Sequence, residues 1–345
     1  MPIKILIAIV LIFSSAFSQR NRDRVRFSGN AEIGIDFQAM GGLGDAVVHD
    51  SRLNRIGTVE TEFRFFIADS VILDFDLEFD HRFRNINLKK LFVRYNFDNS
   101  NARLGYMKKM FTLEEIKSGN DRLFARKSMI NGILSDFHLL GRDFTAQYRY
   151  NFPSYTLIGG YSADGSNRHF ANITLHSNLI NNTTRFVIAG MYMNYLEKGF
   201  PEESERRHAF FGNVGMDFSG RRTDFELEAV LGRNPETPII STWHICNNSE
   251  YDFWGVRFQE SFPVRIGRKH LNKIVPVYEL SFINIFTNAF WQARPGINLN
   301  FTERDRLQWR TNLDLNFELR YCNTENTLRN DLISQRIISA IFVKW

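Results

Sequence analysis

The chain has 345 residues, of which 33 are Phe, 11 are Tyr and only 8 are Pro, and its formal net charge is +5. This modest charge, without a block of basic residues, argues against a nucleic-acid-binding protein. The aromatic load favours β-strands. The mean hydropathy of −0.28 does not exclude a membrane β-barrel, because barrel strands alternate lipid-facing and lumen-facing residues.

Residues 1–18 have the pattern of a secretory signal peptide. Lys4 supplies the positive charge, residues 5–13 form a short apolar run, and Ala16 and Ser18 are small residues suited to a cleavage site. The alternative is a membrane anchor, which needs about 20 apolar residues. We therefore expect cleavage after Ser18 and export of residues 19–345, in which no segment is long enough for a helical membrane span.

Alternation of apolar and polar residues is the dominant period in the rest of the chain. In residues 71–80 every second residue is apolar and the residues between them are acidic, and residues 306–319 repeat the alternation over a longer stretch. Such a strand fits with one face in lipid and the other in water. A soluble β-sandwich also alternates, but it would rarely place several acids in a row opposite aromatic residues.

The pattern predicts sixteen strands, of which the eighth and ninth alternate poorly. From the N-terminus, short links alternate with generally longer ones, which is typical of periplasmic turns and external loops. Residues 341–345 close the last strand on an aromatic carboxyl terminus, as in outer-membrane barrels. We therefore expect an all-β, transmembrane antiparallel barrel in the bacterial outer membrane, with strands at 24–38, 53–68, 70–81, 88–98, 101–108, 141–151, 154–162, 168–176, 183–195, 207–218, 222–232, 250–265, 270–282, 289–302, 305–320 and 332–345.

The longest link, residues 109–140, is the candidate constriction of the barrel. Sixteen strands enclose a lumen too wide for wall side chains to fill, and the chain has no separate plug domain. Thr112 and Glu115 form a capping box for a short helix, and basic residues surround it. Folded inward as a third extracellular loop, these cations would attract anions; the alternative is a solvated external loop.

Part of this region resembles a known family. Three segments are similar to the phosphate-selective porins O and P. They are residues 104–115 (LGYMKKMFTLEE), residues 122–126 (RLFAR) and residues 141–143, at which the next predicted strand begins. The similarity covers about residues 101–150. It implies a sixteen-stranded, usually trimeric porin that conducts anions past an inward-folded loop. The basic residues of the matching block carry over as candidate constriction residues, namely Lys108, Lys109, Arg122 and Arg126.

The predicted lumen wall departs from a continuous ladder of arginines. Alternation places Arg94, Arg149 and Arg310 on the lumen side as candidate wall cations, together with other basic residues. The same face carries an acidic set, so we expect a wall of mixed sign that leans acidic. Opposite charges on neighbouring strands can neutralise one another. The acidic set comprises Glu60, Glu62, Asp74, Asp76, Glu78, Asp80, Asp224, Glu226 and Glu228.

The sequence lacks the common motifs of catalysis and metal binding. The chain has no Gly-x-Ser-x-Gly or His-Glu-x-x-His, and its eight histidines are scattered. Carboxylates of the 74–80 run lie about 7 Å apart along one face, too far for several to share a cation. Cys246 and Cys322 lack zinc-ligand spacing, and we expect them to be unpaired, although an exported chain could oxidise them.

The sequence therefore predicts a non-enzymatic porin without cofactor or metal. It would be a passive channel for small hydrophilic solutes with an anion preference that extends to phosphate. Its expected partners are outer-membrane lipid, small anions and two further copies of the chain, and not nucleic acid. The alternative from another class is a non-transporting barrel, either a surface-binding structural protein or a barrel hydrolase.

Overall fold

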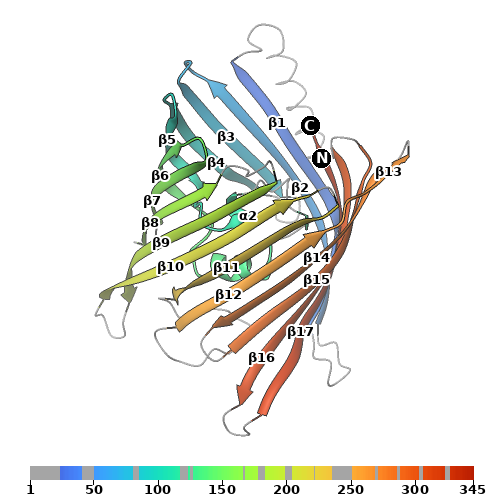
Figure 1. Cartoon of the computed structure of the whole chain (residues 1–345). Coiled ribbons are helices and arrows are strands. Elements are labelled where there is room, and N and C mark those ends of the chain that lie inside the picture. The colour runs from blue at the N-terminus through green and yellow to red at the C-terminus, as the bar shows by residue number, and fades with distance from the viewer. Residues whose placement is uncertain are drawn as a thin grey trace.

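The computed structural model describes residues 24–40, 50–80, 85–116, 123–124, 127–165, 168–177, 183–198, 204–220, 222–234, 251–268, 271–285, 288–302, 306–322 and 327–345. They form one antiparallel sheet that closes into a barrel around a short helical segment (Figure 1). The predicted signal peptide, 1–18, and Cys246 lie outside these residues. No helix within the described ranges is long and apolar enough to cross a membrane.

The strands follow one another around the barrel and pair with their sequence neighbours, except that β12 and β13 both pair with β14. Their bounds are β1 Val25–Met40, β2 Asp50–Phe66, β3 Val71–Asp80, β4 Asn85–Asn96, β5 Ser100–Lys108, β6 Arg142–Asn151, β7 Tyr155–Ala163, β8 His169–Ser177, β9 Thr184–Lys198, β10 Ser204–Ser219, β11 Asp224–Asn234, β12 Tyr251–Ser261, β13 Val264–Arg268, β14 Leu271–Ile285, β15 Asn288–Asn300, β16 Leu307–Cys322 and β17 Thr327–Lys344.

The barrel is closed by pairing between β1 and β17. Gly29 and Trp345 exchange backbone hydrogen bonds of 3.3 and 3.1 Å at this seam. This pairing joins the first and last strands of the sheet, as a sheet in lipid requires. β12 and β13 both pair with β14 and are separated at Pro263, which has no N–H to continue the ladder. They occupy one position in the barrel, so the predicted sixteen-strand architecture is confirmed.

The predicted alternation is visible in the exposure of neighbouring side chains. On β6, Phe144 is 62% exposed and Tyr148 is 49% exposed, while Thr145 and Gln147 between them are buried. The apolar side chains cover the outer surface, and the polar ones point into the lumen. The strands therefore supply a lipid-compatible exterior and a polar inner wall from one period-two pattern.

The link between β5 and β6 carries two helices, α2 (Leu113–Ile116) and α3 (Met129–Asp136). The backbone N–H of Glu115 lies 3.3 Å from Thr112 Oγ1, as the predicted cap requires. Ser128 caps α3 by accepting a hydrogen bond from the Asn131 backbone N–H. Both helices lie within the barrel, where α2 is labelled in Figure 1.

Candidate functional site

The segment that holds α2 and α3 packs an apolar face against the inner wall of the barrel. Ile130, Ile133 and Leu134 of α3 are buried, as are Phe111 and Phe137 on either side of the helices. They belong to one hydrophobic cluster with lumen-facing side chains of β8 to β15. This part of the lumen is therefore filled with side chains rather than water. The wall members are Phe170, Ala189, Met191, Met193, Tyr195, Ala209, Phe211, Val230, Phe253, Ile283, Ile285 and Phe290.

This packing explains why β9 alternates poorly in the sequence. Its inward side chains Ala189, Met191 and Met193 are apolar because they belong to the cluster against which the loop packs. Its outward side chains are apolar because that face is the barrel exterior, where Phe186 and Ile188 are exposed. A strand with two apolar faces loses the period-two signal. In β8 only the inward Phe170 joins this cluster, while Thr174 donates to a loop carbonyl.

Polar contacts fix the same segment to the wall at points distant in sequence. The Leu113 backbone N–H donates to Glu228 of β11 at 2.6 Å. The Met129 backbone N–H donates to Gln292 of β15 at 3.2 Å. Wall side chains also donate to loop carbonyls: Arg294 to Lys127 at 3.0 Å, Asn298 to Leu123 at 2.8 Å and Thr174 to Met110 at 2.7 Å. The loop is thus held at both ends and in its middle.

Glu228 belongs to a buried network of ion pairs. Arg257 of β12 reaches Glu226 at 2.9 Å, Glu228 at 3.3 Å and Glu279 at 3.4 Å. Arg294 extends the network to Asp314 at 2.9 Å. Removing one partner from a buried ionic group costs about 3–5 kcal/mol, because an uncompensated charge remains. These residues therefore orient the carboxylate that receives α2.

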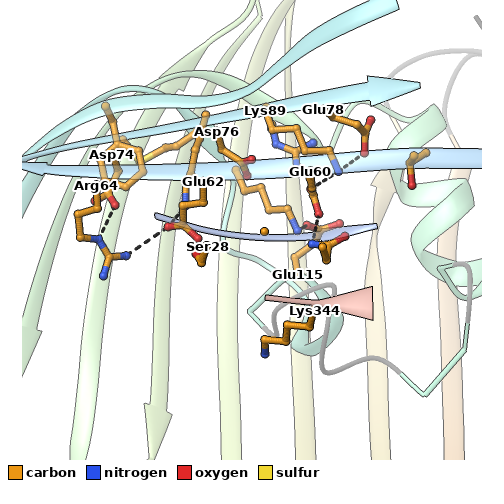
Figure 2. Close-up of a pocket in the computed structure, with 18 of the residues that line it drawn as sticks. Ser28, Glu60, Glu62, Arg64, Asp74, Asp76, Glu78, Lys89, Glu115 and Lys344 are labelled. Atoms are coloured by element: carbon orange, nitrogen blue, oxygen red, sulfur yellow. Dashed lines mark hydrogen bonds and ion pairs between the residues drawn. The ribbon is translucent and has the colours of Figure 1, made fainter. Parts of the chain in front are cut away.

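The aqueous part of the lumen is a cavity of about 610 Å³ between the loop and the wall formed by β1 to β6, β16 and β17 (Figure 2). Its described lining has seven acidic side chains, Glu32, Glu60, Glu62, Asp74, Asp76, Glu78 and Glu115. It has nine basic ones, Arg64, Lys89, Lys90, Arg94, Arg103, Lys108, Arg142, Arg310 and Lys344. The expectation that the lumen leans acidic was therefore wrong for this cavity, because lysines of β4 and residues of the loop region offset the acids of β2 and β3.

Three acidic residues of the cavity, Glu60, Glu62 and Glu78, are paired with lysines. Lys89 bridges Glu60 of β2 and Glu78 of β3, as Figure 2 shows. Lys90 lies 2.5 Å from Glu62. Each of these pairs joins neighbouring strands on the lumen face, so the charges stabilise the wall as well as line the cavity.

On the loop side, Glu115 of α2 is held between two lysines. Lys108 at the end of β5 lies 2.9 Å from it, and Lys127 contacts its other oxygen. Burial alone would raise the pKa of Glu115, but the two ammonium groups lower that pKa to about 2. Glu115 is therefore ionised at neutral pH and ties the two ends of the helical segment together.

The four predicted constriction residues differ in where they lie. Lys108 lines the cavity. Lys109 is 3% exposed; it pairs with Asp143 at 2.8 Å and donates to the His138 carbonyl at 2.6 Å. The expectation that Lys109 lines the pore is therefore corrected: its ammonium is used to fasten the loop. Arg122 and Arg126 lie outside the described residues.

The three predicted wall cations all face the lumen. Arg94 lies 3.7 Å from Asp74. Arg310 stands over the Phe342 ring at 4.0 Å and donates to Gln308 at 2.9 and 2.7 Å. Arg149 of β6 is paired in register with Asn101 of β5, and it is not part of the cavity lining described above. In the described part of the chain, no group of three or more His, Cys, Asp or Glu is arranged to hold a metal ion.

The sequence did not lead us to predict α3 or the hydrophobic wall residues against which it packs. A signal was present, because Ile130, Ile133, Leu134 and Phe137 recur at the spacing of one helical face and Ser128 precedes them as a cap. The predominance of charge elsewhere in the link obscured this pattern. The partners on the wall were not accessible to sequence reasoning, since they come from seven different strands.

Solved structures with this architecture are outer-membrane proteins. OmpTdeltaL8, a loop-deletion mutant of an outer membrane protein of Vibrio cholerae, matches with a TM-score of 0.62 and 11% identity over 93% of this chain and 99% of that chain. The chain has the fold of an outer-membrane β-barrel. The anion-selective porin from Comamonas acidovorans has a TM-score of 0.60 and 11% identity over 93% and 99% of the two chains.

A third match is OprB of Pseudomonas putida, with a TM-score of 0.62 and 8% identity over 96% of this chain and 97% of that chain. At these identities the likeness establishes the fold alone. The searches against protein-family models and curated proteins return no match.

Proposed function

We propose that this chain is an outer-membrane porin, a passive diffusion channel for small hydrophilic solutes. The proposal rests on one observation: a charged cavity lies beside the loop that is fixed inside the closed barrel. A structural barrel has no need of a polar passage beside a packed loop. The likeness to porin folds supports the proposal, while the OmpT matches, described as outer membrane proteins, leave the non-transporting alternative open.

The proposed solute preference is for anions. The described part of the cavity lining has more basic than acidic side chains. The carboxylates of Glu60, Glu62 and Glu78 form ion pairs with lysines. Cations near a water-excluding wall raise the local concentration of anions. Lys108 is the constriction residue that the geometry favours, and Arg122 and Arg126 remain proposed constriction residues. Phosphate is the first oxyanion to test.

The proposal includes export, membrane insertion and assembly. Residues 1–18 would be removed as a signal peptide, and residues 19–345 would insert into the outer membrane as a homotrimer without catalytic activity. The trimer is supported by a solved neighbour, the trimer form of Vibrio cholerae OmpT, with a TM-score of 0.60. Cross-linking of the protein in outer-membrane vesicles should trap three copies, and a product no larger than one chain would contradict this part.

Purified protein in a planar lipid bilayer tests the channel activity. Discrete conductance steps are expected, and proteoliposomes should swell in solutes small enough for a cavity of about 610 Å³. Folded barrels that give neither steps nor swelling would overturn the proposal and favour the surface-binding or hydrolase alternative.

A further inference from the structure

Five arginines gather at one end of the wall that β1 to β6 form. Each lies within three residues of the end of its strand, next to the first residues of β1 or one of the short links at 67–70, 97–99 and 152–154. Short links are typical of the periplasmic end of a barrel. The members of this arginine cluster are Arg26, Arg64, Arg94, Arg103 and Arg149.

The cluster is contiguous across the strands. Arg26 stands directly opposite Arg64 in the β1–β2 register, and Arg94 stands opposite Arg103 in the β4–β5 register. Arg149 acts electrostatically on Arg103 from the next strand. Like charges that face one another across strands destabilise a sheet, so this arrangement costs stability.

Two carboxylates, Asp74 and Glu62, offset part of the positive charge. The buried Asp74 lies 2.7 Å from Arg64 and 3.7 Å from Arg94. Glu62, which also pairs with Lys90, lies 3.3 Å from Arg64. Within the described ranges, no carboxylate forms an ion pair with Arg103 or Arg149. Arg103 donates instead to the Asn101 side chain at 2.9 Å, and Arg149 Nε has no acceptor. The arginine cluster therefore carries an excess of positive charge.

The middle of the cavity differs because its charges are balanced. There five carboxylates face five basic groups. The carboxylates are Glu60, Glu62, Asp76, Glu78 and Glu115, and the basic groups are Lys89, Lys90, Lys108, Lys127 and Arg142. Figure 2 places Arg64 and Asp74 at one end of the drawn pocket and Glu60, Lys89 and Glu78 at the other. The fixed charge of the passage is thus uneven along its length.

We propose that the channel is a rectifier, which passes more current in one direction than in the other. The arginine end admits mainly anions, whereas the balanced middle admits both signs. A voltage of one sign drives anions from the arginine end into the middle of the passage. Anions then enter the middle faster than they leave it, because cations carry part of the current there. Cations accumulate in the middle as well, because the arginine end admits mainly anions. The ion content and the conductance then rise. The opposite voltage depletes the same zone of ions and lowers the current.

This inference rests on the proposed channel activity, and the strength of the rectification must depend on salt. Fixed charges act over about 10 Å at 0.1 M salt but only about 3 Å at 1 M. The current ratio at equal and opposite voltages should therefore depart from one at low salt and approach one at high salt. A tag placed before Arg24 and bound by streptavidin from one chamber identifies the arginine end of each inserted channel.

Two sets of variants test the assignment to the arginine cluster. The first neutralises it by Arg94→Gln, Arg103→Gln and Arg149→Gln. The second keeps all five arginines and adds carboxylates opposite two of them, by Asn101→Glu facing Arg149 and Gln147→Glu facing Arg103. The second set forms cross-strand ion pairs, so it is expected to fold even where the first does not. Both sets should move the low-salt current ratio towards one.

The matched control removes one ion pair from the balanced middle, by Glu78→Gln with Lys89→Gln. It changes two lumen charges without changing their sum, and rectification should persist. Symmetric current in the unaltered protein at low salt, or undiminished rectification in both variant sets, would overturn the inference while leaving the porin proposal intact. A protein without any conductance would overturn the porin proposal itself.

Discussion

The backbone N–H of Leu113 donates a 2.6 Å hydrogen bond to the buried carboxylate of Glu228, which joins two points of the chain that are 115 residues apart. Glu228 also accepts from Asn213 at 2.8 Å. The first turn of α2 is therefore anchored to the inner face of β10 and β11. A loop held in this way acts as a fixed part of the wall.

Replacement of Glu228 should loosen the loop. Glu228→Leu leaves the Leu113 N–H without an acceptor, which costs about 1–3 kcal/mol for a buried donor, and it removes one partner of Arg257. We expect a lower thermal midpoint and a larger, less steady single-channel conductance. Glu228→Gln, which retains an acceptor oxygen, should have a smaller effect. Equal behaviour of both variants and the unaltered protein would mean that this anchor is dispensable.

Acid should weaken the link between Glu115 and its two lysines. Lys108 and Lys127 lower the pKa of Glu115 from 4.5 to about 2 despite its burial. A lowered pKa in the folded state stabilises the fold above the ordinary pKa, and this contribution is lost as the pH falls through the folded-state value. The difference in thermal midpoint between the unaltered protein and Glu115→Gln should shrink from pH 5 towards pH 2. A difference independent of pH would contradict the ionised assignment.

The lipid-facing register can be tested on β16. Leu315 points outwards, where a lysine costs roughly 2–4 kcal/mol near the middle of the bilayer. Asn316 points inwards and contacts Gln292 at 2.7 Å and Ser334 at 3.0 Å. Leu315→Lys should reduce the yield of folded barrel in membranes far more than Asn316→Lys. Similar yields for the two would show that the register is shifted by one residue.

The strands could be predicted from the sequence because one face of each strand contacts lipid and the other faces the lumen. Phe144 and Tyr148 alternate with Thr145 and Gln147, so the period-two pattern records lipid on one side and the lumen on the other. The predicted strand 250–265 covers β12 and only the first two residues of β13. It runs through the break at Pro263 because the residues on both sides keep one register with β14.

The interior of the lumen could be predicted only in part. The link 109–140 and its Thr112 cap were visible in the sequence, and Lys108 does line the cavity. The burial of Lys109 was not predictable, because it depends on Asp143 and on the Phe170 ring 3.8 Å away. A charge in a sequence looks the same whether it faces water or fastens a loop, and tertiary contacts decide between the two.

Removal of the signal peptide has a direct readout. If residues 1–18 direct export, the protein extracted from outer membranes begins at Gln19, and changing the apolar run 5–13 to polar residues should leave the chain in the cytosol. N-terminal sequencing of the membrane-extracted protein decides this point. A membrane-inserted chain that still begins at Met1 would contradict the cleavage site.

The reversal potential in a salt gradient tests the central claim most directly, since its sign reports whether anions or cations carry the current. We expect an anion-selective value for the unaltered channel and a shift towards cations in Lys108→Gln with Arg142→Gln, both in the cavity lining. The matched pair Arg206→Gln with Arg233→Gln removes two exposed charges outside that lining and should leave the value unchanged. A cation-selective unaltered channel, or equal shifts in the two double variants, would contradict the account.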